Sequence, residues 1–329
     1  MRNLRDQTVV IAGASSGMGL ASALAFARLG CNLVLAARRE EAVKQAALRC
    51  NETGAAEAVG LVADVTDPRQ MGALASAAME RFGRIDVWVN MAGLSMWGAF
   101  EEIPVEAQAR LVQVNLIGVM NGCHAALPHM LRQGRGVLIN MSSIGGRMPM
   151  PFAAAYTASK YGVTGFTEAL RDEVSARSGV KVCGVYPGFV DTPTNLHSAN
   201  YTGRTLRPIP PVLDPEKVAE GIVSLAQYPR RSLHLGLHNA LAVPYAVAPE
   251  ATGRTAGKMM EGFLLHSGQP APATEGTLFD PVAEGTTTRG GWRPDPGTAT
   301  SLTASLALLA AVPIGLLALS VGLGMRGRR

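Results

Sequence analysis

Short apolar segments alternate with Ala-rich helical stretches over about the first 235 residues, and this alternation constrains the fold most. The segments with the length and β-branched content of strands are 8–12, 32–36, 58–62, 87–90, 136–141, 181–186 and 232–235. Helical patterns lie between them, near 18–29, 40–50, 68–82, 105–131, 153–178 and 215–227. Nearly continuous apolar strands separated by helices predict a parallel sheet covered on both faces. We therefore expect an α/β fold with a doubly wound parallel sheet in a single domain.

Composition excludes several classes of protein. The net charge of the 329-residue chain is +5, but its Arg residues are dispersed and form no basic stripe interleaved with aromatic residues, so we expect no nucleic-acid partner. Four widely spaced cysteines contain no Cys-x-x-Cys pair and are typical of buried free thiols in a reducing compartment. The polar start of the chain, residues 1–7, is not typical of a signal peptide.

The character of the sequence changes after about residue 266. Residues 269–297 are rich in Pro, Gly and Thr and lack apolar periodicity, which is typical of a linker or of a tail that lies along the surface. We divide the chain into a domain at 1–265, this segment at 266–300, and a C-terminal membrane helix with a basic end at 301–329.

The membrane helix is predicted from residues 302–325, which carry no charge. A helix of this length spans about 36 Å, more than the roughly 30 Å of a bilayer core. A buried core helix is the alternative, and Pro313 and Gly315 allow a kink or a segment that enters without crossing. Arg residues flank the segment on both sides, at 289 and 293 and within 326–329, so charge does not settle its orientation.

A glycine-rich loop directly follows the first apolar segment and opens an Ala-rich helix. It reads Gly13-Ala-Ser-Ser-Gly-Met-Gly19, with a Gly-x3-Gly-x-Gly spacing. Glycines permit a tight turn and a close approach of backbone to a pyrophosphate, and the helix N-terminus favours its negative charge. A strand before the loop and a helix after it indicate a dinucleotide site in a Rossmann-like fold.

The end of the second strand distinguishes the two nicotinamide cofactors. A carboxylate there binds the ribose hydroxyls of NAD, but this chain has Arg38 and Arg39 and no acid before Glu40. A guanidinium binds a 2′-phosphate through paired hydrogen bonds. We predict NADP, with NAD less favoured, and with Arg38 as the main ligand supported by Arg39 or Ser15. The alternative is that both arginines are solvated charges at a helix start.

Tyr156 and Lys160 lie four residues apart on a predicted helix, so their side chains share one face. An ammonium there favours the phenolate and would bring a hydroxyl with a free pKa of about 10 toward neutrality. A Ser hydroxyl from a neighbouring strand would complete a set for carbonyl reduction or alcohol oxidation. Such pairs also arise by chance on amphipathic helices. Ser142 and Ser143 compete for the hydroxyl, because adjacent strand residues face opposite sides.

Residues 5–235 resemble the short-chain dehydrogenase/reductase family, whose motifs occur here in the same order along the chain. They are the glycine loop, Asp64-Val65, Asn90-Met-Ala-Gly93, Asn115, Ser143 thirteen residues before Tyr156, Pro187-Gly188, and Thr192. Ala12 departs from the usual Thr before the first glycine, and Met91 from the usual second Asn. Neither change touches the catalytic set, so we expect altered loop stability and retained activity.

The resemblance implies a role for each matched residue. Tyr156 would exchange a proton with the substrate oxygen, Lys160 would lower the tyrosine pKa and bind the nicotinamide ribose, and Ser143 would polarise the carbonyl. Asn115 would hold a water that links Lys160 to solvent, although a helix Asn that bridges backbone groups is the alternative. The implied cofactor contacts are Gly13, Ser15, Ser16, Gly17, Met18, Gly19, Arg38, Arg39, Asp64, Val65, Asn90, Ala92, Gly93, Tyr156, Lys160, Pro187, Gly188, Val190 and Thr192.

These observations predict an NADP-dependent oxidoreductase that acts on a carbonyl or alcohol substrate and needs no metal. The membrane segment favours a lipophilic small molecule and a membrane-anchored protein with its catalytic domain in the cytoplasm. A homodimer or homotetramer is expected from the resemblance. An epimerase or dehydratase on the same fold, and a membrane-tethered NADP-binding scaffold or redox sensor without turnover, are the alternatives.

Overall fold

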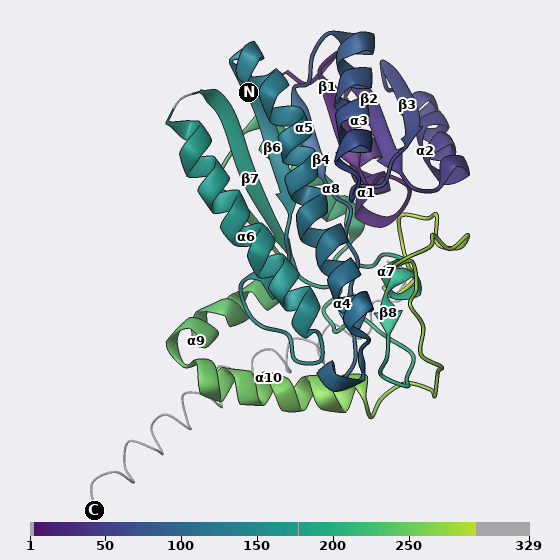
Figure 1. Cartoon of the computed structure of the whole chain (residues 1–329), viewed down its shortest axis with the longest axis vertical. Helices are drawn as coiled ribbons and strands as arrows, with labels where there is room; N and C mark the ends of the chain where they lie inside the picture. The colour runs from purple at the N-terminus through teal and green to yellow at the C-terminus, as the bar shows by residue number, and fades with distance from the viewer. Residues whose placement is uncertain (1–2, 177, 294–329) are drawn as a thin grey trace, which may run out of the picture.

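The computed structural model describes residues 3–176 and 178–293, and a parallel sheet forms the centre of this part (Figure 1). Within these residues the sheet has seven strands in the order β3-β2-β1-β4-β6-β7-β9. The strands are β1 (Thr8–Ala12), β2 (Asn32–Ala37), β3 (Glu57–Val62), β4 (Val87–Asn90), β6 (Arg135–Met141), β7 (Gly179–Pro187) and β9 (Ser232–Leu235). The strand order reverses between β1 and β4, where open α/β sheets bind their ligands.

Helices cover both faces of the sheet because the strands are apolar on both sides. In β1, Val9 and Ile11 pack in one core cluster, whereas Val10 and Ala12 pack in the other. The first cluster takes in α1 (Gly17–Ala27), α2 (Glu40–Thr53) and α8 (Pro215–Gln227). The second takes in α3 (Pro68–Phe82), α5 (Gly118–Gln133) and α6 (Ala154–Ser175), with α4 (Val105–Val112) lying against α6.

The predicted doubly wound parallel sheet is confirmed. The strands at Thr8–Ala12, Val87–Asn90 and Ser232–Leu235 and the helices at Pro68–Phe82 and Pro215–Gln227 have the predicted bounds, and the other predicted elements differ by one to three residues at their ends. The predicted helix over 105–131 is interrupted by a π-helical turn, η2 (Gln113–Ile117). The structure also contains two strands of two residues each, β5 (Met96–Trp97) and β8 (Ala199–Asn200), which pair with each other. No alternation of apolar and polar residues in the sequence predicted them.

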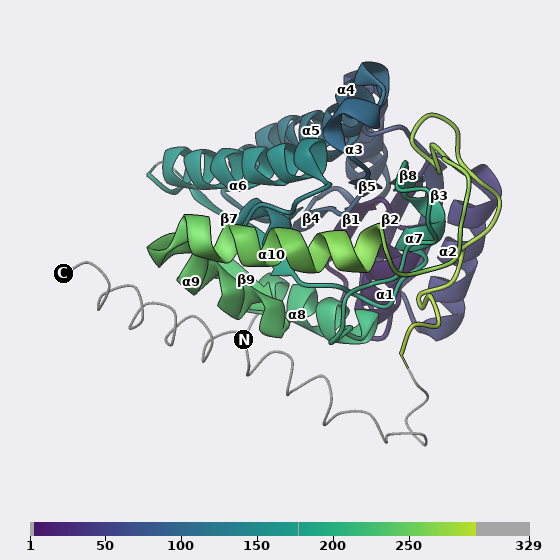
Figure 2. The same cartoon turned by 90° about the horizontal axis from the view of Figure 1, so that it is seen from below.

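Two α-helices after β9 lie below the carboxyl edge of the sheet in Figure 1 and in front of it in Figure 2, which is seen from below, and an irregular segment then runs up the side of the domain past β8 and α7. The helices are α9 (Ala242–Val247) and α10 (Pro249–Leu264), followed by residues 269–293, which we call the strap. Backbone bridges tie the strap to the domain at Arg204–Pro270 and Asn200–Thr274. The sequence left open whether this segment is a linker or a tail that lies along the surface. Its described part is bound to the domain.

No helix among residues 3–176 and 178–293 is long and apolar enough to cross a bilayer. The membrane helix predicted at 302–325 lies outside the described residues. Arg289 and Arg293, which entered the orientation argument as flanking charges, form ion pairs with carboxylates of the domain.

A buried polar network lies beneath the carboxyl edge of the sheet. The side chain of Asn90 accepts a hydrogen bond from Trp88 Nε1 at 2.8 Å and donates one to Asn140 Oδ1 at 2.8 Å. Gly122 of α5 lies against it, and a Cβ atom there would be 2.0 Å from Asn90 Oδ1. Asn90 therefore supports the edge of the sheet from below, and its contact with the cofactor stays a prediction.

This geometry predicts opposite effects for two Gly-to-Ala substitutions in helix interiors. Gly72→Ala in α3 meets open space, so it should stabilise the fold by roughly 0.5–1 kcal/mol through reduced freedom of the unfolded chain. Gly122→Ala should instead cost about 2 kcal/mol because it displaces the Asn90 network. Urea unfolding of both variants beside wild type measures this, and equal free energies of unfolding would contradict it.

Candidate active site

The glycine loop joins β1 to α1 in a conformation that only glycine allows at several points. Gly13 and Gly17 have φ angles of 100° and 53°, in the left-handed region. A Cβ atom at Gly19 would be 1.9 Å from the carbonyl oxygen of Gly13. No side chain caps α1 at Ser16, and the first amide of the helix, that of Gly17, donates to the carbonyl oxygen of Thr287 at 2.8 Å.

Two adjoining cavities at the carboxyl edge form one cleft. The first is lined by Gly13, Ser15, Ser16, Gly17, Met18, Gly19, Arg38, Arg39, Asp64, Val65, Ala92 and Gly93, among others. The second is lined by Ser143, Tyr156, Lys160, Pro187, Gly188, Val190 and Thr192, with apolar residues further out. Met18, Met91, Gly93, Leu94 and Thr194 line both. The structure therefore brings nearly all predicted site residues onto one continuous wall.

Helix α6 presents Tyr156 and Lys160 to the second cavity. The Lys160 ammonium lies 5.9 Å from the centroid of the Tyr156 ring and donates a hydrogen bond to the carbonyl oxygen of Met141 at 3.0 Å. Burial lowers the pKa of Lys160 from 10.5 to about 8. This lysine is thus held, positively charged at neutral pH, between β6 and the tyrosine.

The pKa of Tyr156 differs from the sequence-based expectation. Burial raises it above its usual value, and only a hydrogen bond with Ser143 opposes this rise. Burial is the largest cause of the shift, and the Lys160 ammonium donates its hydrogen bond to Met141 and lies 5.9 Å from the centroid of the tyrosine ring. Tyr156 is therefore protonated at neutral pH, the state that a proton donor requires.

The structure distinguishes the two adjacent serines at the end of β6. The hydroxyl of Ser142 donates to the carbonyl oxygen of Lys160 at 3.1 Å and shares a hydrogen bond with Thr164, so it fixes α6 to the sheet. Ser143 accepts from the amide of Gly145 and bonds to Tyr156. Ser143 is thus the serine that meets the tyrosine.

Asn115 lies in the π-helical turn η2, a type of distortion common at functional sites. Its amide group bridges the backbone of Leu94, with contacts of 2.8 and 2.9 Å, and donates to Ser159 at 3.0 Å. A Cβ atom on Gly93 would meet both Asn115 Oδ1 and Lys160 Nζ, at 3.3 and 3.2 Å. Asn115 therefore shapes the wall beside the lysine, and the water predicted for it stays a prediction.

The corner of the first cavity combines positive and negative groups. Asp64 accepts hydrogen bonds from Thr66 and, at 2.9 Å, from Arg110. Burial favours the protonated acid, but these hydrogen bonds and the Arg110 charge outweigh it and hold the pKa of Asp64 below its usual range. Burial lowers the pKa of Arg38, and the Asp64 charge opposes this effect. The corner thus presents a net positive charge to the cleft.

Several residues of the cleft escaped the sequence analysis. Thr277 and Pro281 of the strap line the first cavity, and Trp97, Met150, Phe189, Ile209 and Leu264 line the second. These come from irregular segments or from distant elements, so no local pattern marks them. Among the described residues, no group of three or more His, Cys, Asp or Glu side chains is placed to hold a metal ion.

Comparison with known proteins identifies the family of this chain. Residues 7–201 match the family model described as short chain dehydrogenase. The chain belongs to the short-chain dehydrogenase family. An uncharacterised oxidoreductase of Bacillus subtilis, YxnA, is 34% identical over 326 residues, which cover 97% of this chain and 91% of the relative. A 3β-hydroxysteroid dehydrogenase of Eggerthella lenta is 36% identical over 68% of this chain and 88% of its own length.

Solved structures match the fold of this chain. An actinorhodin polyketide ketoreductase variant with NADPH matches with a TM-score of 0.64 and 32% identity, over 71% of this chain and 97% of its own. Levodione reductase matches with a TM-score of 0.64 and 26% identity, over 74% of this chain and 100% of its own. These two structures cover 71–74% of the chain, whereas the Bacillus subtilis relative aligns over 97% of it.

The burial of Lys160 predicts that the stability of the protein depends on pH. Because its folded pKa of about 8 lies below the ordinary 10.5, the charged lysine opposes folding below pH 8, and this cost disappears between pH 8 and 10.5. Lys160→Met should therefore be more stable than wild type by about 2 kcal/mol at pH 7, after the lost bond to Met141 is allowed for. Urea unfolding at pH 7 and pH 10.5 measures this.

The advantage of Lys160→Met should shrink toward zero at the higher pH. Lys181→Met, at an exposed position of β7, is the control and should show a pH-independent difference. An advantage of Lys160→Met that grows with pH would contradict the assigned burial.

Proposed function

We propose that this protein transfers a hydride between NADP(H) and a carbonyl or alcohol substrate. The observation that carries the proposal is the position of Ser143, Tyr156 and Lys160 at one end of a cleft whose other end holds Arg38 and the N-terminus of α1, which no side chain caps. The pyrophosphate would bind to the amides of the glycine loop and the first turn of α1. The nicotinamide half would then extend past Gly93 toward Tyr156.

The bound cofactor supplies a hydride for reduction and accepts one for oxidation. In the reducing direction, the Tyr156 hydroxyl gives its proton to the substrate oxygen as negative charge develops there, and Ser143 donates a hydrogen bond to the same oxygen. The buried Lys160 ammonium stabilises the resulting phenolate. Asn115 supports the part of the cleft beside Lys160. A water bound to Asn115 would return a proton from solvent to Lys160.

Loss of the Tyr156 hydroxyl should separate catalysis from cofactor binding. Tyr156→Phe should lower kcat at least about 100-fold, the usual contribution of general acid catalysis, while the Kd for NADPH stays within about twofold. Steady-state oxidation of NADPH with a panel of lipophilic ketones and aldehydes measures the first, and fluorescence titration the second. Undiminished turnover in the variant would exclude the proposed mechanism. Tight cofactor binding without turnover by wild type would instead favour the scaffold.

The cofactor proposal is supported by Arg38 and Arg39 at the end of β2, and by the NADPH named with the polyketide ketoreductase structure. Arg38→Ala should weaken NADPH binding about tenfold to a hundredfold, the range for a hydrogen bond to a charged group. The Kd for NADH should change less than about threefold. Isothermal titration with both cofactors measures this, and an equal loss for both would count against a 2′-phosphate site.

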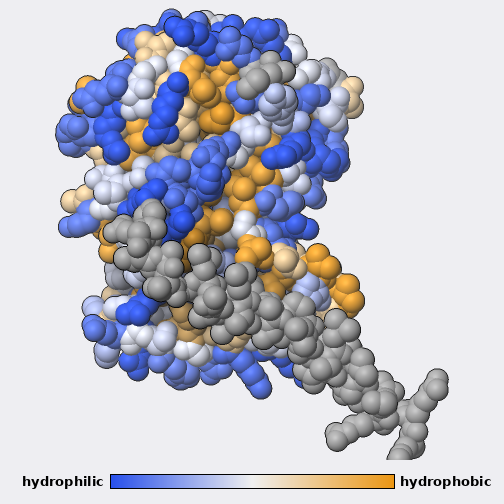
Figure 3. Space-filling model, turned by 180° about the vertical axis from the view of Figure 1, so that it is seen from behind, coloured by the Kyte–Doolittle hydropathy of each residue, from blue (hydrophilic) through white to orange (hydrophobic). Residues whose placement is uncertain are grey.

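The proposed substrate is a lipophilic small molecule. The outer wall of the second cavity is apolar, and four of its residues, Ile144, Met150, Phe189 and Ile209, also line a further apolar cavity beneath α10. An elongated substrate would place its carbonyl at Tyr156 and its apolar end beneath α10. Hydrophobic surface also gathers at the lower right of Figure 3, on the side of α9, where Val243 and Val247 are exposed.

Filling the cavity beneath α10 should discriminate between substrates by length. Ala256 lines this cavity, so Ala256→Trp should lower kcat/KM for long-chain ketones about tenfold or more and spare short ones. Ala251→Trp, at an exposed position of the same helix, is the matched control and should change neither. An equal loss for short and long substrates would contradict the placement of the apolar end.

We also propose that residues 302–325 anchor the protein in a membrane with the catalytic domain in the cytoplasm, and that the domain forms a homodimer or homotetramer through α4–α6. The exposed Val105 and Tyr161 on these helices support such an interface. Carbonate extraction of membranes that carry the full chain, and light scattering in detergent, test the two proposals separately.

A further inference from the structure

Backbone carbonyl oxygens of the strap accept hydrogen bonds from the same donor groups that would bind NADP(H). Arg38 donates to two strap carbonyl oxygens, one of them at 2.7 Å, and Nη1 of Arg39 lies 2.7–3.1 Å from three others. The amide of Gly17, in the glycine loop, donates to a sixth at 2.8 Å. The acceptors are the carbonyl oxygens of Thr277, Phe279, Val282, Ala283, Glu284 and Thr287.

These contacts compete directly with a phosphate-bearing ligand. A guanidinium has five N–H donors, and those turned toward the strap cannot also bind a 2′-phosphate. A phosphate oxygen is the stronger acceptor because it is charged, so the exchange is favourable when the ligand is present. Binding must still break the strap contacts, and the stability of the bound strap therefore subtracts from the affinity.

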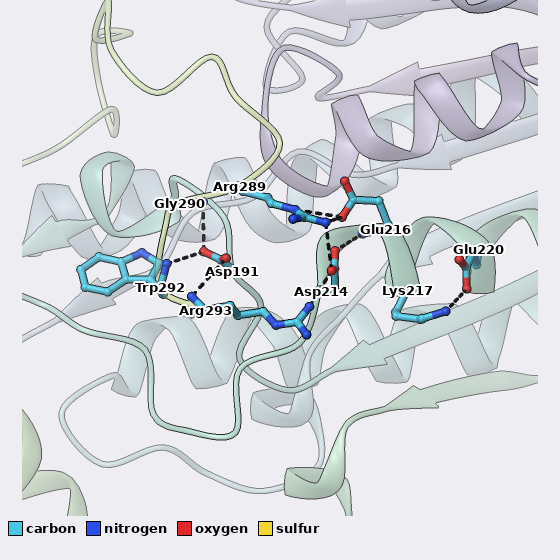
Figure 4. A network of polar contacts seen from close by, with 9 residues as sticks. All are labelled: Asp191, Asp214, Glu216, Lys217, Glu220, Arg289, Gly290, Trp292 and Arg293. Atoms are coloured by element: carbon cyan, nitrogen blue, oxygen red, sulfur yellow. Dashed lines mark hydrogen bonds and ion pairs between the residues drawn. The ribbon is translucent and has the colours of Figure 1, made fainter. Parts of the chain in front are cut away.

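A latch holds the far end of the strap on the loop after β7 and on α8 (Figure 4). Asp191 accepts from the amides of Gly290 and Trp292 at 3.0 and 2.9 Å. Arg289 lies 3.0 Å from a carboxylate oxygen of both Asp214 and Glu216, and Arg293 lies 2.5 Å from Asp214. The two arginine side chains remain about half exposed, so each ion pair is of modest strength.

The near end of the strap is fixed by packing. Leu278 is fully buried among residues of α4 and β5, and its carbonyl oxygen accepts from Arg110 at 3.2 Å. The amide of Thr277 donates to the carbonyl oxygen of His197 at 2.9 Å. The strap is therefore attached on both sides of the cleft, with one end held by a core side chain and the other by surface charges that are easier to release.

We propose that the strap is an internal competitor for the phosphate-binding donors, and that the latch of Arg289 and Arg293 sets the affinity for NADP(H). This inference rests on the proposed function, because it takes the cleft to be the NADP(H) site. The 2′-phosphate displaces the carbonyl oxygens from Arg38 and Arg39, and the pyrophosphate displaces the one from Gly17. NADPH meets more of this competition than NADH, which lacks the 2′-phosphate.

Weakening the latch tests the proposal through cofactor affinity. The double variant Arg289→Ala/Arg293→Ala in the full chain should lower the Kd for NADPH and for 2′,5′-ADP about three- to tenfold, since an exposed ion pair shifts an equilibrium by up to roughly fivefold. The Kd for NADH should fall less. Arg254→Ala, which breaks an exposed ion pair with Glu250 on α10, is the matched control and should leave all three unchanged. An unchanged or raised Kd for NADPH in the double variant, or an equal fall for NADH, would overturn the proposal.

Hydrogen–deuterium exchange of the wild-type chain provides a second test that no variant can confound by misfolding. Saturating NADPH or 2′,5′-ADP should increase exchange at the amides of Gly290 and Trp292, which the latch protects. Reduced exchange there would show that the strap closes onto the cofactor and would overturn the proposal. Failure of the wild type to bind any of the three ligands would contradict the proposed function itself, and the inference would fall with it.

Discussion

The parallel direction of the strands is the constraint on which the site depends, because it brings the ends of β1, β2, β4, β6 and β7 to one edge. Each end contributes one part of the cleft: the glycine loop after β1, Arg38 after β2, Gly93 after β4, Ser143 after β6 and Gly188 after β7. Residues up to 175 positions apart in the sequence therefore line the same cleft. The covering helices fix this edge, and the buried Asn90 network stiffens it from below.

Charge and burial then differentiate the two ends of the cleft. At one end, the glycine-loop amides and the guanidiniums of Arg38 and Arg39 create a positive corner in which Arg110 neutralises Asp64. At the other, burial keeps Tyr156 protonated while it brings the pKa of Lys160 close to neutrality. An anion is favoured at the first end and a proton donor beside a cation at the second. A molecule that carries phosphates at one end and a hydride donor at the other matches this distribution.

The sequence predicts the sheet and the gathering of Ser143, Tyr156 and Lys160 at one cavity, because both follow from local rules. Apolar periodicity locates the strands, and the i, i+4 spacing places Tyr156 and Lys160 on one face. Neither rule says where an ammonium points, so the hydrogen bond of Lys160 to Met141 and the raised pKa of Tyr156 were missed. The contacts of the strap with Arg38 and Arg39 were missed because they are made by backbone carbonyl oxygens, which every sequence possesses. The segment at 302–325 lies beyond the described residues, and its membrane role stays a prediction.

A crystal structure of the full chain with NADPH would test the central claim most directly. The account predicts the pyrophosphate at the N-terminus of α1, the 2′-phosphate at Arg38, and the nicotinamide ring in the second cavity beside Tyr156 and Lys160. NADPH bound in the opposite orientation, or with its nicotinamide outside the reach of the Tyr156 hydroxyl, would contradict the assignment of Ser143, Tyr156 and Lys160 as the groups that carry the reaction.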